Sequence, residues 1–194
     1  GARKPLGAVV KAFQQGAGDD AVLTIKAQTT LRRGDLRIAD DDSEISRRYR
    51  TNDGDTPVLG FDDDRIRIVT DDLPEAAFLA DLQRHDVVVG VSRWEGLGLH
   101  LYECEALQMP LILNRMEPYV AFQAEGGAAT FVDSHVIGTR RFGLEAHEID
   151  IDSLAATFRA LSDRDQLVAS QQIETVPHAQ RWQQFLASAQ ALVT

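Results

Sequence analysis

The sequence contains very little cysteine, since Cys104 is the one cysteine among 194 residues. This rules out an internal disulfide framework and favours a reducing compartment, with the cytoplasm as the default expectation. Long apolar runs are also missing, because none approaches the roughly 18 residues that span a bilayer. The first residues lack the apolar stretch of a signal peptide. The sequence therefore predicts a chain that does not span a membrane.

Basic residues are scarce relative to acidic ones. Lys and Arg number 20 against 30 Asp and Glu, which gives a net charge of −10. This balance argues against a nucleic-acid partner, which would require a basic face. A small anionic ligand remains compatible, because a few local cations and a helix N-terminus can bind phosphate. The acidic clusters at 40–42, 62–64 and 71–72 lack the ligand spacing of a calcium loop and are interpreted as solvated loops.

Several common active-site motifs are missing as well. No Gly-x-Gly-x-x-Gly follows a predicted strand and no P-loop occurs, which disfavours a dinucleotide or P-loop site. Ser92 lacks the flanking glycines of a hydrolase nucleophile. The five histidines are scattered without metal-ligand spacing, so no metal site is predicted.

Short apolar runs alternate along the chain with amphipathic stretches. Such alternation implies right-handed crossovers and a parallel sheet with helices on both faces. We therefore expect an α/β fold, a Rossmann-like three-layer domain covering 1–194. The segment Thr29 to Gly60 fits poorly, because its charges and its Asp53-Gly54 turn interrupt any periodicity, and it is interpreted as partly disordered or as a local insertion. The predicted strands are Ala21 to Ile25, Ile66 to Val69, Val87 to Val91, Leu111 to Leu113 and, as the last strand, Ala129 to Val132; the predicted helices are Leu6 to Phe13, Glu75 to Gln83, Gly98 to Leu107, Pro118 to Ala124, Ile151 to Leu161, Asp163 to Gln171 and His178 to Leu192.

The loop after the Val87 to Val91 strand carries the most informative residues. Ligands bind at this edge of open parallel sheets. Gly96 and Gly98 allow close backbone approach, and the following helix directs free N–H groups outward, which suits a diphosphate. Glu95 and Glu103 are separated by about 7–8 Å along the axis of the predicted helix, which suits one carboxylate that binds a sugar and one that binds a ribose. The alternative is an ordinary strand–loop–helix junction in which both carboxylates face solvent.

Three further residues are relevant to the site; Lys26 and Trp94 each have two interpretations, and Cys104 has a structural one. Lys26 ends the first predicted strand at the same edge, where it provides a second phosphate contact or a solvated strand end. Trp94 lines the donor pocket or packs the loop. Cys104 lies on a helix that is expected to pack, and we interpret it as a small core residue.

The stretch Ser92 to Gly98 with Glu103, continued by Ala106 and Met109 to Ile112, resembles the signature of retaining glycosyltransferases of the GT-B fold, group 1 (family 4). Members carry a Glu, seven residues and a second Glu, followed by a small residue, a proline and a strand. The Arg3-Lys4 pair before a helix is similar to the basic pair that opens their donor domain. The resemblance covers about three quarters of the chain. Departures are His100 at a usual proline, Gln108-Met109 at a glycine-containing pair and Arg115 to Glu117 at a glycine-rich turn.

The resemblance implies transfer of a hexose from a nucleotide diphosphate sugar to an acceptor hydroxyl, with retention, in polysaccharide or glycoconjugate biosynthesis. Lys4 would stabilise the leaving diphosphate and Glu95 would hold sugar hydroxyls in the transition state, so these two are the implied catalytic residues. No cofactor and no metal are expected, because protein cations take the metal's role. The implied donor-binding residues are Arg3, Lys26, Leu73, Gly96, Leu97, Gly98 and Glu103.

The expected partners follow from the same resemblance. They are the nucleotide-sugar donor and an N-terminal GT-B acceptor domain of the same protein, absent from this chain, through which the protein could associate peripherally with a membrane. A first strand of the donor domain should lie upstream of Lys4. Two alternatives remain open: a GT-B-type nucleotide-sugar epimerase or phosphorylase, and a non-catalytic GT-B module that binds a partner.

Overall fold

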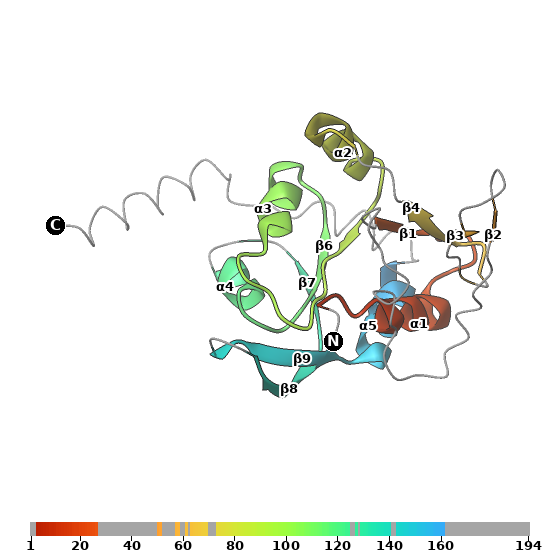
Figure 1. Ribbon diagram of the computed structural model, residues 1–194. Helices are drawn as coiled ribbons and strands as arrows, with labels where there is room; N and C mark the ends of the chain where they lie inside the picture. Colours follow the sequence, from red (N-terminus) through yellow and green to blue (C-terminus); the bar gives the residue numbers. More distant parts are fainter. Residues whose placement is uncertain are drawn as a thin grey trace.

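The computed structural model describes residues 3–26, 50–51, 57–58, 61, 63–69, 73–124, 127, 129–140 and 143–161. Helices and strands alternate over most of this part of the chain (Figure 1). The elements are α1 (Leu6–Gly16), β1 (Leu23–Lys26), β2 (Arg50–Thr51), β3 (Pro57–Val58), β4 (Ile66–Val69), α2 (Glu75–Leu82), β5 (Val88–Val89), α3 (Leu99–Ala106), β6 (Leu111–Asn114), α4 (Tyr119–Ala124), β7 (Thr130–Val132), β8 (Ser134–Thr139), β9 (Glu145–Ile149) and α5 (Ile151–Leu161).

Two parallel sheets form the centre of the described chain. In the first, β1 pairs with β4, with Leu23 opposite Ile66. In the second, β6 lies between β5 and β7, with Ile112 opposite both Val89 and Thr130. Two antiparallel pairs complete the strands, β2 with β3 and β8 with β9. The structure is therefore a mixed α/β fold with parallel sheets.

Most of the predicted elements inside the described residues are confirmed, several to within one or two residues. The prediction that Ala129 to Val132 is the last strand is wrong, because the β8–β9 hairpin follows it. The hairpin escaped detection because nearly all of β8 is exposed, which leaves no alternating apolar pattern. The predicted helices Asp163 to Gln171 and His178 to Leu192 lie outside the described residues, as does most of Thr29 to Gly60.

One apolar core joins the two parallel sheets. Helices α1 and α5 pack together, with the Phe13 and Phe158 rings edge to face at 5.7 Å. Strands β1, β4, β5 and β6 contribute side chains to the same cluster, including Ile66 and Ile112. At the helix contact, a Cβ on Gly16 would overlap the Ala155 carbonyl oxygen, so close approach there requires glycine. The core is thus built from elements near both ends of the described chain.

A second core cluster lies on the other face of β6. Leu111 and Leu113 point into it, whereas Ile112 between them points into the first cluster. Leu101 from α3 and Phe122 from α4 fill this second cluster. All four β6 residues are buried, as expected for a strand covered on both faces. Among the described residues, no helix is both long and apolar enough to cross a membrane.

Candidate functional site

The loop after β5 is anchored to the carboxyl end of β6. The Ser92 N–H donates to the Asn114 side-chain oxygen at 2.8 Å, and both residues are fully buried. The chain then turns through Glu95 toward α3. This is the edge of the parallel sheet at which the sequence predicts ligand binding.

Two cations from before α1 reach this loop. Arg3 Nη1 lies 2.6 Å from Glu95 Oε1, and Lys4 Nζ lies 3.6 Å from Glu95 Oε2. Lys4 Nζ also donates to Ser92 Oγ at 2.5 Å. The Arg93 N–H donates to the Arg3 carbonyl at 2.8 Å and fixes the backbone before α1. The structure therefore brings the adjacent predicted site residues Arg3 and Lys4 together with Glu95, which lies 92 residues after Arg3.

Burial differs strongly between the partners in this cluster. The Glu95 side chain is 6 % exposed, whereas those of Arg3 and Lys4 are 52 % and 44 % exposed. The alternative of an ordinary junction is therefore wrong about a solvent-facing Glu95, whereas the solvent-facing Glu103 that it predicts is confirmed. Glu95 is an internal counter-charge that leaves one side of each cation open to solvent.

Two site residues were missed by the sequence analysis. The Tyr119 hydroxyl donates to the Gly90 carbonyl at 2.8 Å and lies 3.0 Å from Ser92 Oγ. The His100 ring packs edge to face on Tyr119, with Nε2 3.4 Å from the hydroxyl. The side chains of Ser92, Tyr119 and His100 thus form a mostly buried polar cluster, and Ser92 accepts a hydrogen bond from Lys4. The one sequence signal was His100, which stands out as a departure from the glycosyltransferase pattern.

The environment shifts the pKa values of the cluster. Partial burial lowers the Lys4 pKa, with a further contribution from Arg3 and opposition from Glu95. Burial by itself would raise the pKa of Glu95, but the Gly96 N–H and the charges of Lys4 and Arg3 outweigh it and the pKa is lowered. Burial and the Lys4 charge lower the pKa of His100 to about 4. His100 is therefore neutral at pH 7.

The predicted glycine turn precedes α3. The exposed Gly96 donates its N–H to Glu95 Oε1 at 3.1 Å. Leu97 is 74 % exposed. Gly98 is the N-cap residue of α3 with a φ of 64°, in the left-handed region that favours glycine. The turn is thus built around the same carboxylate that holds the two cations.

The other predicted donor-binding residues lie at separate positions. Glu103 is exposed on α3, and no hydrogen bond or ion pair joins it to the Arg3–Lys4–Glu95 cluster. Lys26 is the exposed last residue of β1, and the half-buried Leu73 precedes α2. The proposed contacts of these three residues with a donor stay predictions.

The β8–β9 hairpin holds the loop from the other side. The Arg93 carbonyl accepts from the His147 N–H at 2.7 Å, and Arg93 pairs with Glu148 at 3.2 Å. Trp94 stacks under the Arg140 guanidinium, 4.4 Å from its ring centroid, which favours packing of the loop. An element that the sequence analysis missed therefore helps to position Glu95.

Cys104 is 1 % exposed and lies in the core cluster with Leu101, so its interpretation as a core residue is confirmed. Burial raises its pKa to about 12.

Asp63, expected in a solvated loop, is instead paired with Arg65 at 2.9 Å. The rest of the three acidic clusters, apart from Asp64, lies outside the described residues.

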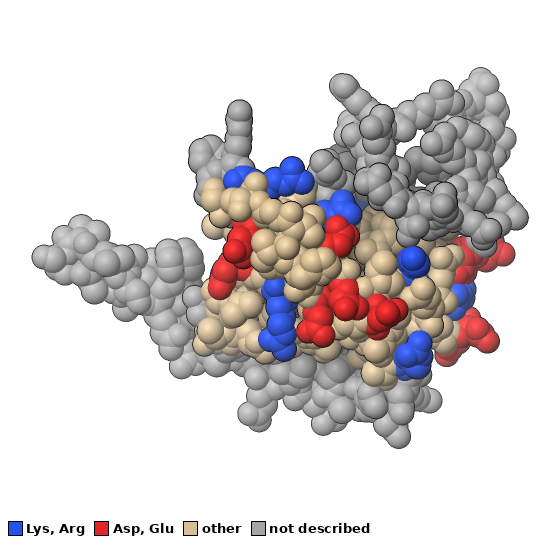
Figure 2. All heavy atoms as spheres, turned by 90° about the horizontal axis from the view of Figure 1, so that it is seen from below, with Lys and Arg blue, Asp and Glu red and all other residues tan. Residues whose placement is uncertain are grey.

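No group of three or more metal-ligating side chains is gathered among the described residues. On the face in Figure 2, positive and negative side chains are interspersed and form no broad basic surface among the residues that it colours. Comparisons with protein-family models, curated proteins and solved structures found no match to this chain. The geometry around Glu95 is therefore the strongest indication of function.

Proposed function

We propose that the chain is the donor-binding part of a retaining glycosyltransferase that uses a nucleotide diphosphate sugar. The observation that carries the proposal is the cluster in which Arg3 and Lys4 flank the buried Glu95. It lies at the carboxyl end of β5 and directly before the glycine turn of α3. A leaving diphosphate gains negative charge as the glycosidic bond breaks, and cations at such an edge stabilise that charge.

The charges in the cluster suit an anionic ligand. Without a ligand, Glu95 offsets the repulsion between the two cations and holds both in place. Their exposed sides then bind the diphosphate, and the N-terminus of α3 contributes its partial positive charge. Glu95 is left to accept hydrogen bonds from sugar hydroxyls as the ring becomes oxocarbenium-like. Glu103 binds the ribose hydroxyls.

The finer features of the proposal follow from the glycosyltransferase resemblance. The two parallel sheets would belong to one Rossmann-like three-layer domain, the C-terminal half of a GT-B fold. The acceptor would bind mainly to an N-terminal half of the same cytoplasmic protein. The transferred group would be a hexose, and no metal or cofactor would be needed.

A charge-matched pair of variants tests the proposal. Lys4→Gln removes one positive charge at the site, and Arg67→Gln removes one from an exposed position on β4. Titration calorimetry with UDP and GDP should show binding weakened by about tenfold or more in Lys4→Gln, because a charge-assisted contact is lost. The loss should shrink at high salt as screening grows. Arg67→Gln should bind like the parent chain.

Two results would count against the proposal. One is the absence of nucleoside diphosphate binding by the parent chain at millimolar ligand. The other is an equal loss of affinity in both variants, which would indicate general attraction instead of a site.

A further inference from the structure

Oxygen atoms of three described residues lie near the Lys4 ammonium group and hold it unequally. Lys4 Nζ lies 2.5 Å from Ser92 Oγ, 3.4 Å from the Gly90 carbonyl oxygen and 3.6 Å from Glu95 Oε2. Hydrogen bonds from N–H to oxygen are normally about 2.7–3.2 Å long. The Ser92 hydroxyl is therefore the anchor of Lys4. The two longer contacts can be exchanged for contacts with a ligand.

The Tyr119 hydroxyl determines where the Ser92 hydroxyl points. Tyr119 Oη lies 2.8 Å from the Gly90 carbonyl oxygen, which can only accept, so Tyr119 donates its proton there. The contact of 3.0 Å between Tyr119 Oη and Ser92 Oγ then has Ser92 as its donor. The other acceptor near Ser92, Glu95 Oε2, is farther away at 3.4 Å. The Ser92 proton therefore goes to Tyr119, and the Ser92 lone pairs are left for Lys4.

These contacts form a chain of hydrogen bonds that runs in one direction. It leads from Lys4 Nζ through Ser92 Oγ and Tyr119 Oη to the Gly90 carbonyl. Successive hydrogen bonds of this kind polarise and strengthen one another, particularly away from water. Ser92 and Tyr119 are both fully buried. Burial also raises the pKa of Tyr119 above its ordinary value, so the hydroxyl keeps the proton that it donates.

The packing of Tyr119 fixes the far end of this chain. Tyr119 is the first residue of α4, and its ring belongs to the second core cluster together with Leu101 and Phe122. The His100 ring lies edge to face on it at 5.7 Å. The ring cannot turn without opening the core. The position of α4 is thereby transmitted to Lys4, which precedes α1.

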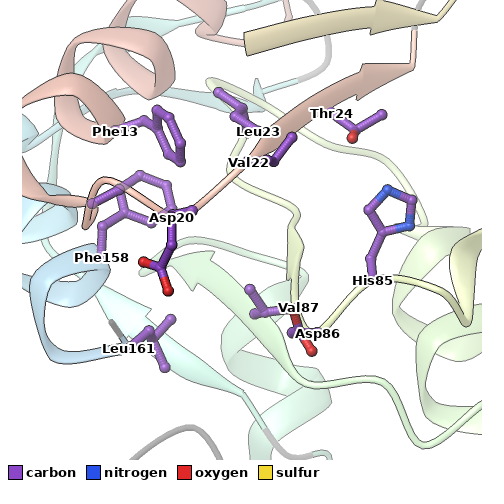
Figure 3. A pocket seen from close by; sticks show the side chains of 12 residues that line it. Phe13, Asp20, Val22, Leu23, Thr24, His85, Asp86, Val87, Phe158 and Leu161 are labelled. Atoms are coloured by element: carbon purple, nitrogen blue, oxygen red, sulfur yellow. The ribbon is translucent and has the colours of Figure 1, made fainter. Parts of the chain in front are cut away.

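The chain of hydrogen bonds is separate from a cavity of about 320 Å³. Figure 3 shows this cavity with His85, Asp86 and Val87 on one side, beside the amino end of β5. Gly90 follows Val87 toward the carboxyl end of β5, about 10 Å away at roughly 3.3 Å per residue. The Tyr119 hydroxyl therefore serves the edge at which Lys4 lies and not the cavity.

We propose that Tyr119 is a positioning residue for the Lys4 ammonium group at the diphosphate site. Its hydroxyl accepts the Ser92 proton and so keeps Ser92 from competing with Lys4 for Glu95. Lys4 stays anchored on Ser92 while its other N–H groups turn to phosphate oxygens. The role of Lys4 toward a diphosphate rests on the proposed function, whereas the way in which Lys4 is held rests on these contacts alone.

The first test measures how Lys4 is held, without any ligand. Tyr119→Phe keeps the ring and removes the hydroxyl, and Tyr102→Phe makes the same change on α3. The Lys4 pKa is followed by NMR of the lysine side chains, which belong to Lys4, Lys11 and Lys26. It should fall in Tyr119→Phe, because the charged form loses the chain that stabilises it. It should be unchanged in Tyr102→Phe.

The second test measures the consequence for binding. Titration calorimetry with UDP should show affinity weakened by about threefold to tenfold in Tyr119→Phe, the scale of one hydrogen bond. In a Lys4→Gln background, Tyr119→Phe should have little further effect, because it acts through Lys4. Equal losses with and without Lys4 would overturn the proposal, since they would indicate general loosening of the site.

Ser92→Ala keeps the tests decisive if Tyr119→Phe does not fold. It removes the middle of the chain of hydrogen bonds and should also lower the Lys4 pKa. Absence of UDP binding by the parent chain would count against the proposed function alone. A Lys4 pKa that is unchanged in Tyr119→Phe, or in Ser92→Ala where Tyr119→Phe does not fold, would refute the positioning role, whatever the parent chain binds.

Discussion

Acidification is expected to destabilise the fold through His100. This ring is partly buried against Tyr119, and the charged groups around it are Lys4, Arg3 and Glu95. Burial and the Lys4 charge disfavour the protonated ring and lower its pKa to about 4, from the ordinary value of 6.5. Replacement of His100 by Gln keeps a polar side chain and removes the titration.

The pKa difference sets the sign and size of the effect. Between pH 4 and 6.5 the unfolded chain binds a proton that the folded chain does not, so the free energy of unfolding falls as the pH falls. From pH 7.5 to 5.0, a group with these two pKa values loses about 2 kcal/mol of stability. This is an upper value, because solvent screens a ring that is partly exposed. The interval lies above the ordinary pKa range of Asp and Glu.

Urea denaturation of the parent chain and of His100→Gln, each at pH 7.5 and 5.0, measures the effect. The parent chain should lose more stability than the variant, by up to about 2 kcal/mol. The other four histidines are the same in both proteins and cancel in this comparison. An identical pH dependence in the two proteins would refute the assignment of a neutral, partly buried His100.

The remaining predictions concern three side chains. Glu103→Ala should weaken UDP or GDP binding by about tenfold or more in calorimetry and leave the melting temperature nearly unchanged, because Glu103 is exposed; an unchanged affinity would reject the ribose contact. Glu95→Gln should retain nucleoside diphosphate binding but lower the turnover of the complete enzyme by about a hundredfold; a stable variant with normal turnover would defeat the catalytic role, and a loss of thermal stability alone would assign Glu95 to the loop. Cys104, with burial raising its pKa to about 12, should resist iodoacetamide at pH 8 in the folded chain and react in urea; rapid alkylation of the folded chain would contradict its place in the core.

The sequence predicts helices and strands well where burial of one face requires apolar residues at regular intervals. Ile66–Val69 is predicted with its observed bounds, because Ile66 and Ile68 alternate with the exposed Arg67, as is typical of a half-buried strand. The β8 strand was not predicted from the sequence. It is mostly exposed and is stabilised by its pairing with β9, so its sequence shows little alternation of apolar and polar residues.

Only the part of the candidate site that lies within one stretch of sequence could be predicted from local pattern. Glu95 and the glycine turn belong to one loop, so the sequence places them side by side, although spacing alone left an ordinary junction as the alternative. The burial of Glu95 and the support from Tyr119 depend on contacts between elements that are distant in the sequence. Arg3 and Lys4 were placed by resemblance, and no local pattern could show that they reach the carboxylate.

The packing of α1 on α5 has a consequence for the order of events during synthesis. Helix α1 leaves the ribosome before α5, which is the last described element to emerge. Until then the apolar face of α1, with Val9, Val10 and Phe13, lacks the partner that covers it in the folded chain. The nascent chain should therefore complete its core late. Until α5 emerges, the apolar face of α1 stays exposed, as expected of folds that depend on distant contacts. Chaperones that bind apolar helices would meet α1 before α5 can cover it.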